Sequence, residues 1–404
     1  MLIRPRNIPE AWWVGSGALL LVAFRFISPS AAARAIAGGS DVYFFLLGMM
    51  LLSGLGREHG VFHWVSSKAV RGARGRSSRL FLLVYAAGAA VTACLSNDAT
   101  AVVLTPAILA AVRKAKAAPL PYLFACAMIA NAASFVLPIS NPANLVVFHR
   151  TMPPLARWLA AFELPSILSI VVTYLVLRLY FRSSLRAAVE LEVEDARLTP
   201  AGKLVLCGLG LVVALLLTVS ALRWNLGLPT CMAALLLVAV LCGKERTSPA
   251  PLAGEISWAT LALVAGLFVM VRAAENYGAL GYTQAALAWL RGRAPGSGAL
   301  ATAFGVGAAN NLVNNLPLGL LAGTTLRAAG VHGLLANATL IGVDLGPNLS
   351  VTGSLATVLW LIALRREGLH VSAADFLKAG LLAMPAAILA SVGGLLFLHA
   401  VFGI

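Results

Sequence analysis

Long apolar runs, separated by short basic or polar segments, cover most of this 404-residue chain. Clear examples are residues 204–222, 226–242, 258–271 and 377–402. A helix needs about 20 apolar residues to cross the hydrocarbon core of a bilayer, so these runs predict several membrane-spanning helices. The first run, residues 11–27, has no small-residue cleavage site after it. We expect it to remain as an anchor rather than to be removed as a signal peptide.

Polar residues interrupt the apolar pattern at four places. The four breaks are C-L-S-N-D-A-T at 94–100, P-I-S-N-P-A-N at 138–144, N-N-L-V-N-N-L-P at 310–317 and G-V-D-L-G-P-N-L-S-V-T-G-S at 342–354. Proline cannot continue a regular helix, so two of these segments predict helices that are broken within the membrane. Non-helical backbone at that depth is tolerated only where it is packed in protein or lines a cavity. We therefore expect the breaks to share one internal site.

The basic residues predict how the chain crosses the membrane. Lys and Arg concentrate in cytoplasmic loops, and basic clusters at 57–79 and 113–116 flank the apolar segment 80–112. That segment is too long for one span and too short for two, which predicts a re-entrant hairpin that enters from the cytoplasm. The basic pair Lys244 and Arg246 places a second hairpin on the opposite side. The N-terminus is expected in the cytoplasm.

These features predict two related halves of opposite orientation. Asn314 follows Asn97 at the same separation as Glu275 follows Glu58. Internal repeats with broken helices are typical of secondary transporters. The predicted fold is an all-α polytopic membrane protein of two inverted repeats, each with a re-entrant helical hairpin and a proline-broken transmembrane helix, with roughly 9–11 spans besides the hairpins. Its expected boundaries are 1–181 for the first half (hairpin 80–112, broken helix 121–149, returning run 165–181), 182–202 for a charged cytosolic linker, and 203–404 for the second half (hairpin 298–326, broken helix 332–364).

Composition supports this class and excludes others. The chain is 60% hydrophobic and 11% charged, with a formal net charge of +15. Cytoplasmic basic loops explain the positive charge, so we predict no nucleic-acid partner. The five cysteines show no paired spacing, which indicates neither a disulfide framework nor a metal site. No phosphate-binding G-x-x-x-x-G-K-[ST] loop is present, and we expect no cofactor.

Two aspartates are predicted at membrane depth, Asp98 and Asp344. A charged Asp at the centre of a membrane helix costs at least about 2.5 kcal/mol by insertion scales, so such a residue is a functional hypothesis by default. Burial favours the neutral form of a carboxylate, and both are therefore candidates to carry a coupling proton. The alternative is that either one caps a half-helix N-terminus.

Amide and hydroxyl side chains gather at the same breaks. The predicted substrate-binding residues are Asn97, Thr100, Ser140, Asn141, Asn144, Asn310, Asn314, Asn315, Asn348, Thr352 and Ser354. These groups offer donors and acceptors without net charge, which suits a neutral polyhydroxylated solute; with carboxylates they also suit a hydrated cation. A dianion would require more fixed positive charge. The alternative is that the side chains only satisfy backbone groups that the breaks set free.

Three segments of the chain resemble ArsB-type arsenite/antimonite efflux pumps. The most specific is G-V-D-L-G-P-N-L-S-V-T-G-S-L-A-T-V-L-W-L at 342–361; N-N-L-P at 314–317 and S-N-D-A-T-A-V-V-L-T-P at 96–106 resemble the two hairpins. The resemblance implies export of As(III) and Sb(III) across the inner membrane in exchange for protons, with metalloid resistance as the result. It also implies a possible cytosolic arsenite-stimulated ATPase as a partner.

Two alternatives remain open. The N-D and N-P motifs are shared across the ion-transporter superfamily, which includes sodium/proton antiporters and dicarboxylate carriers, so a sodium/proton antiporter is the second hypothesis. An intramembrane hydrolase that uses Asp98 and Asp344 as a pair is a distant third.

Overall fold

The computed structural model describes residues 10–190, 196–278 and 280–403. Within these ranges the chain folds into helices without a β-sheet, and one isolated bridge joins Arg76 to Ala188. Six of the described helices are long and apolar enough to cross a membrane, or up to seven if the bent pair α2–α3 is one span. The prediction of an all-α polytopic membrane protein is confirmed. The predicted number of spans and the inverted relation of the halves stay predictions.

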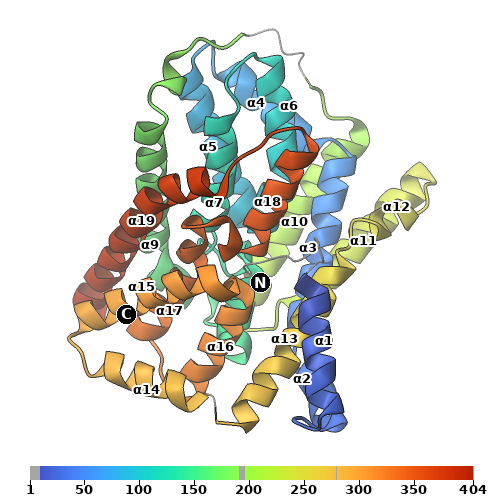
Figure 1. Cartoon of the computed structure of the whole chain (residues 1–404). Helices are drawn as coiled ribbons and strands as arrows, with labels where there is room; N and C mark the ends of the chain where they lie inside the picture. Colours follow the sequence, from blue (N-terminus) through green and yellow to red (C-terminus); the bar gives the residue numbers. More distant parts are fainter. Residues whose placement is uncertain (1–9, 191–195, 279, 404) are drawn as a thin grey trace.

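One group of helices lies on one side of the molecule in Figure 1. It contains α1 (Glu10–Ala23), α2 (Pro29–Gly38), α3 (Ser40–Glu58), α10 (Pro200–Ala221), α11 (Gly227–Glu245), α12 (Ala250–Ala253) and α13 (Trp258–Asn276). α3 packs along α11 and α1 packs along α13. Gly48 allows the first contact, because a Cβ there would lie 2.7 Å from the backbone of Thr230. Small residues of this kind permit close helix approach in membranes.

The second group carries the four breaks. From the first half it contains α4 (Val61–Gly72), α5 (Ser77–Cys94), a π-helical turn η2 (Ala99–Leu104), α6 (Thr105–Lys114), α7 (Leu120–Ala132), η3 (Pro138–Ser140), α8 (Pro142–Phe148), η4 (His149–Thr151) and α9 (Leu155–Tyr180). From the second half it contains α14 (Leu280–Arg291), α15 (Pro295–Val313), α16 (Asn315–Ala328), α17 (Leu334–Leu345), η6 (Gly346–Asn348), η7 (Val351–Gly353), α18 (Leu355–Arg366) and α19 (Ala373–Phe402).

The predicted halves are not separate bodies. α19 packs along α9, and α16 packs against α8, so the second group is built from both halves of the chain. The short η5 turn (Ser184–Arg186) lies within the predicted linker 182–202, part of which lies outside the described residues.

One predicted boundary is wrong. The returning run was expected to begin at Pro165, but α9 begins at Leu155 and contains Pro165 in its interior. A proline inside a membrane helix frees a backbone carbonyl that a neighbouring helix can satisfy. The carbonyl that loses its helical donor is that of Ala161, four residues before Pro165. The Ser391 hydroxyl of α19 donates a 3.0 Å hydrogen bond to the carbonyl of Pro165 itself, which joins the two helices beside the proline.

Candidate substrate and proton site

The segment predicted as the tip of the first hairpin is a short capped turn between α5 and η2. The Ser96 hydroxyl accepts a 3.1 Å hydrogen bond from the Ala99 amide. The side-chain carbonyl of Asn97 accepts a 2.9 Å bond from the Asp98 amide. Six residues of π-helix follow, Ala99–Leu104. Such π-helical turns are rare, and those that exist are often at functional sites. This one begins directly after Asp98.

A cavity of about 110 Å³ lies against this tip. It is enclosed by α3, by the segment that leads into α13, and by the first turns of α8 and α18. The polar residues that line it are Ser53, Arg57, Ser96, Asp98, Glu255, Ser257 and Thr260. Residues of both helix groups therefore line the cavity that Asp98 faces.

Asp98 faces this cavity. Its side chain is partly exposed and makes no hydrogen bond or ion pair within the described ranges. A carboxylate in this position is available to a ligand or a proton that enters the cavity.

Asp344 has a different environment. It is fully buried and is not a lining residue of the Asp98 cavity. Its Oδ1 atom accepts a 2.7 Å hydrogen bond from Nδ2 of Asn141, and its Oδ2 atom is buried without a partner among the described residues. A charged carboxylate in such a place is costly without an ion pair. The hydrogen bond joins the break at 342–354 to the break at 138–144.

Ser140 and Asn144 form hydrogen bonds with backbone groups in and beside the break at 138–144. The Ser140 hydroxyl donates to the Ala93 carbonyl at 3.0 Å and accepts from the Leu137 amide. The Asn144 amide donates to the Ser134 carbonyl at 2.9 Å and reaches two further carbonyls of the same break. These two side chains satisfy backbone groups, which is the alternative that the sequence left open.

Side-chain to backbone hydrogen bonds also join the break at 310–317 to the break at 342–354. The Asn310 amide donates to the carbonyls of Gly342 and Val343 at 2.9 and 2.7 Å. The Asn314 amide lies 3.5 Å from the Thr352 carbonyl, and the Thr352 hydroxyl donates to the Asn311 carbonyl at 3.2 Å. The structure therefore brings these residues together, but their side chains bond backbone carbonyls of the two segments.

Three other predicted residues also lie off the cavity. Thr100 is buried and bonds Thr92 at 2.8 Å within its hairpin. The Ser354 hydroxyl caps α18 by accepting from the Thr357 amide at 3.1 Å. Asn315 is buried, and no side-chain hydrogen bond of it is found in the described part of the chain.

Sequence reasoning missed one member of the buried polar network. Nδ2 of Asn131, in the regular helix α7, donates a 3.0 Å hydrogen bond to Oδ1 of Asn348, and the Asn348 amide donates to the Met128 carbonyl at 3.1 Å. Ser53, Ser257 and Thr260 were likewise not predicted, although they line the cavity. The one available signal for Asn131 was an amide inside an otherwise apolar helix.

The cavity carries little unbalanced positive charge. Its basic lining residue, Arg57, forms an ion pair with Glu255. Cys94 is exposed and is not a lining residue. In the described residues no group of three or more His, Cys, Asp or Glu is placed to hold a metal ion. The arrangement offers hydroxyls and one free carboxylate.

Comparisons with known proteins place this geometry in a transporter context. A family model described as "Citrate transporter" (CitMHS) matches residues 1–342. The arsenical pump membrane protein of Escherichia coli K12 is 26% identical over 94% of this chain and 91% of its own. The putative arsenical pump membrane protein of Bacillus subtilis is 23% identical over 98% and 96%. The predicted resemblance is confirmed.

A solved structure has the same overall fold. The crystal structure of the Alcanivorax borkumensis YdaH transporter, whose topology is described as unusual, superposes with a TM-score of 0.62. The match covers 92% of this chain and 87% of that chain at 17% identity. At this identity the likeness concerns the fold alone.

Proposed function

The chain belongs to the citrate transporter (CitMHS) family, and from this premise we propose that it is a secondary transporter that exports arsenite and antimonite from the cytoplasm in exchange for protons. The cargo is the neutral trihydroxide. The observation that carries the proposal is the cavity at Asp98, with its hydroxyl lining and its single free carboxylate.

The size and lining of the cavity suit a small hydroxylated solute. A water molecule occupies about 30 Å³ of liquid, so about 110 Å³ accommodates a molecule with three hydroxyl groups. The hydroxyls of Ser53, Ser96 and Thr260 are both donors and acceptors, and Asp98 accepts when ionised. A neutral trihydroxide therefore finds partners for its O–H groups without a counter-charge.

The same lining argues against citrate as the cargo. A tricarboxylate is bound best by unpaired Arg or Lys in a bidentate arrangement. The guanidinium of Arg57 is already paired with Glu255, and Asp98 adds a negative charge. The family description alone does not outweigh this charge balance, whereas arsenical pump relatives that align over nearly the whole chain favour arsenite.

Proton coupling follows if cargo and proton compete for Asp98. The ionised carboxylate accepts hydrogen bonds from the trihydroxide, and the protonated carboxyl resets the site after release. One inward proton gains about 2.3 kcal/mol per 100 mV of membrane potential, which is about a 50-fold accumulation ratio. Asp344 acts as a positioning residue, since Asn141 holds it away from the cavity. The proposed cycle is driven by the proton gradient and does not require a separate ATPase.

We place the protein in the inner membrane, with the N-terminus and the basic loop 57–79 on the cytoplasmic side. In that orientation the Asp98 cavity faces the cytoplasm, because Arg57 at the end of α3 lies at its rim. Cargo would enter there.

A sodium/proton antiporter is the second candidate. Four hydroxyls and a carboxylate around one cavity also form a set of hard oxygen ligands, the type that alkali and alkaline-earth cations prefer. The two candidates differ in what drives proton movement. An intramembrane hydrolase is not proposed, because Asp344 does not share the cavity with Asp98.

Everted membrane vesicles, whose outer surface is the cytoplasmic face, test the proposal. Vesicles that contain the protein and are energised by respiration should accumulate labelled arsenite, and a protonophore should release it. Proton release on addition of Na⁺, without arsenite accumulation, would support the antiporter instead. Accumulation of citrate but not arsenite would reject the cargo assignment.

A further inference from the structure

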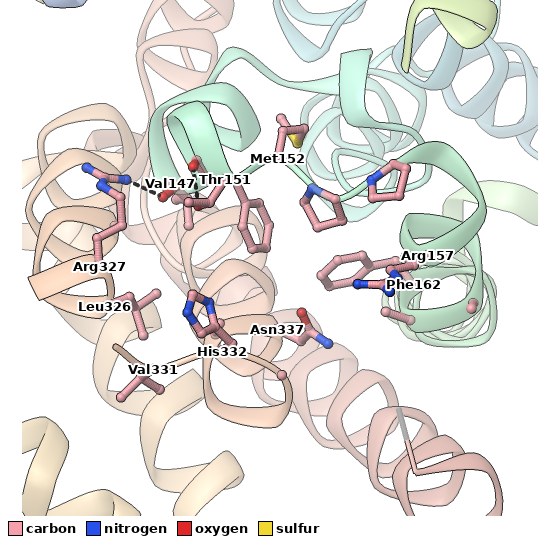
Figure 2. Close-up of a pocket in the computed structure, with 18 of the residues that line it drawn as sticks. Val147, Thr151, Met152, Arg157, Phe162, Leu326, Arg327, Val331, His332 and Asn337 are labelled. Carbon is pink, nitrogen blue, oxygen red and sulfur yellow. Dashed lines mark hydrogen bonds between the residues drawn. The ribbon is translucent and has the colours of Figure 1, made fainter. Parts of the chain in front are cut away.

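A second and larger cavity, of about 620 Å³, shares no lining residue with the Asp98 cavity. It is enclosed by the end of α8, the connection to α9, the end of α16 and the start of α17 (Figure 2). In Figure 1 the region of α14 and α16 lies at the opposite end of the molecule from α4 and α6. With the orientation proposed above, this cavity opens on the external face.

The ionisable side chains that line this cavity are all basic, and two carboxylates lie just outside it: Glu275 interacts electrostatically with Arg327, and Asp41 shares a neighbouring cavity with Arg223. Arg157, Arg223, Arg327 and His332 line it, and no Asp or Glu does so within the described ranges. Basic residues normally concentrate on the cytoplasmic side of a membrane protein, so three arginines around one external hollow are unexpected. A concave surface with a single sign of charge focuses the field and raises the local concentration of counter-ions.

Two hydrogen bonds hold the Arg327 guanidinium in place and leave further N–H donors available. It is partly buried, and its guanidinium donates to the Val147 carbonyl at 3.1 Å and to the Thr324 hydroxyl at 3.1 Å. A guanidinium carries five N–H donors, so others remain for a ligand. Arg157 and Arg223 are exposed, and neither has a carboxylate partner in the described part of the chain.

Asn337 supplies an uncharged hydrogen-bond donor to the same cavity. Its residue is only 7% exposed, yet its side chain makes no hydrogen bond within the described residues. In Figure 2 it lies with His332 between Arg327 on one side and Arg157 on the other. Its amide is therefore available to donate a hydrogen bond to water or to an oxygen of a group that occupies the cavity.

We propose that this cavity is a binding site for a small multivalent oxyanion of the phosphate class. Arg157, Arg223 and Arg327 neutralise its charge, and the Asn337 amide donates to one of its oxygens. Two sources share this chemistry, free phosphate and the headgroup of an anionic phospholipid. Arg223 lies in the connection between α10 and α11 of the first helix group, whereas Arg157 and Arg327 belong to the second. A bound anion would therefore tie the two groups together and stabilise this conformation.

Thermal unfolding of the full-length protein in a neutral detergent tests the site. Inorganic phosphate is titrated at constant ionic strength, balanced with sodium chloride. The Tm of the wild type should rise with the logarithm of the phosphate concentration. The double variant Arg157→Gln/Arg223→Gln should bind about ten- to a hundredfold more weakly, because charge-assisted hydrogen bonds are lost. Asn337→Leu should weaken binding without a change of charge.

The matched control is Arg178→Gln/Arg182→Gln, which removes two exposed arginines outside the cavity. It should respond to phosphate like the wild type. For the lipid source, the proteins are placed in phosphatidylcholine nanodiscs with and without phosphatidylglycerol. If phosphatidylglycerol stabilises the wild type but not the cavity variant, while phosphate has no effect, the occupant is the lipid headgroup and the site stands.

The proposal is overturned if neither phosphate nor phosphatidylglycerol raises the Tm. It is also overturned if the cavity variant and the control respond equally. Because the readout is anion binding, either result leaves the arsenite proposal unaffected.

Discussion

Nδ2 of Asn141 donates a 2.7 Å hydrogen bond to Oδ1 of Asp344, which lies 203 residues further along the chain. This contact joins the two helix breaks and leaves the other oxygen of Asp344 buried without a partner among the described residues. Asp98, by contrast, faces a cavity. The two aspartates that the sequence treats alike therefore have different surroundings, and we assign them different roles.

The Asn141–Asp344 contact should contribute measurably to stability. Asn141→Leu leaves a buried carboxyl without its donor, and such an unsatisfied group costs about 1–3 kcal/mol. It also removes the 3.0 Å bond by which the Asn141 side chain accepts from the Ala143 amide and caps α8, so the single variant loses both bonds. Unfolding of the purified protein in denaturant measures the loss. The exchange Asn141→Asp/Asp344→Asn restores an amide–carboxyl pair, so it should be more stable than the sum of its single variants predicts. Strict additivity would show that the contact contributes nothing.

Filling the cavity should block access to Asp98. Ser53→Phe places a ring from α3 into the space of about 110 Å³, and arsenite uptake into everted vesicles should fall at least about tenfold if about 1.4 kcal/mol of cargo binding is lost. The control Phe44→Leu changes the exposed side of the same helix and should leave uptake unchanged. Normal uptake by a correctly folded Ser53→Phe protein would exclude the cavity as the cargo path.

The Arg57–Glu255 pair should determine selectivity more than stability. Its side chains are 56% and 24% exposed, and exposed pairs contribute about 0–1 kcal/mol. Glu255→Gln should therefore leave the Tm nearly unchanged. It frees the Arg57 charge at the cavity, so phosphate added to everted vesicles should now inhibit arsenite uptake.

The control for this variant is Glu367→Gln, which breaks the similarly exposed Arg113–Glu367 pair outside the cavity. It should not make uptake sensitive to phosphate. Equal inhibition of both variants and of the wild type would contradict the role given to Arg57.

The tip of the second hairpin should hold backbone strain. Asn314 has φ 77° and ψ 154°, a region that is nearly restricted to glycine and costs about 1–3 kcal/mol for other residues. Asn314→Gly should stabilise the protein by about 1 kcal/mol, because the side-chain hydrogen bonds that are lost are long, 3.4 and 3.5 Å. Thermal unfolding measures the change. Ala308→Gly, at an exposed position inside α15, should instead destabilise by about 0.5–1 kcal/mol. A loss of stability in Asn314→Gly would show that the conformation is not strained.

The breaks could be predicted from the sequence because proline, glycine and asparagine in an apolar run have direct backbone consequences. Pro142 and Pro347 each lie where the structure interrupts a helix. The start of the returning run was harder to predict. Proline usually interrupts a helix, yet Pro165 lies inside α9, where α19 packs along the helix and Ser391 bonds the Pro165 carbonyl. A partner from a distant helix cannot be read from local pattern.

The sequence could not predict which polar side chains line the cavity and which ones bond backbone groups. Thr100, Asn144 and Ser354 have the residue types of a binding site, yet each bonds its own hairpin, break or helix end. Ser140 accepts from the Leu137 amide in its own break and donates to the Ala93 carbonyl of α5. Asn131 has no local signal beyond its polarity, since its partner Asn348 comes from the other break. Side-chain roles here depend on which breaks meet, and that is a property of the packed helices.

The most direct test of the account is arsenite-driven proton movement in proteoliposomes, measured for the wild type, Asp98→Asn and Asp344→Asn. Asp98→Asn should abolish the proton signal while arsenite still binds, because the amide can hydrogen-bond the cargo but cannot carry a proton at this site. Asp344→Asn should keep the signal, since an amide can still accept from Asn141. Loss of coupling in Asp344→Asn with normal coupling in Asp98→Asn would contradict the assignment of the proton to the cavity.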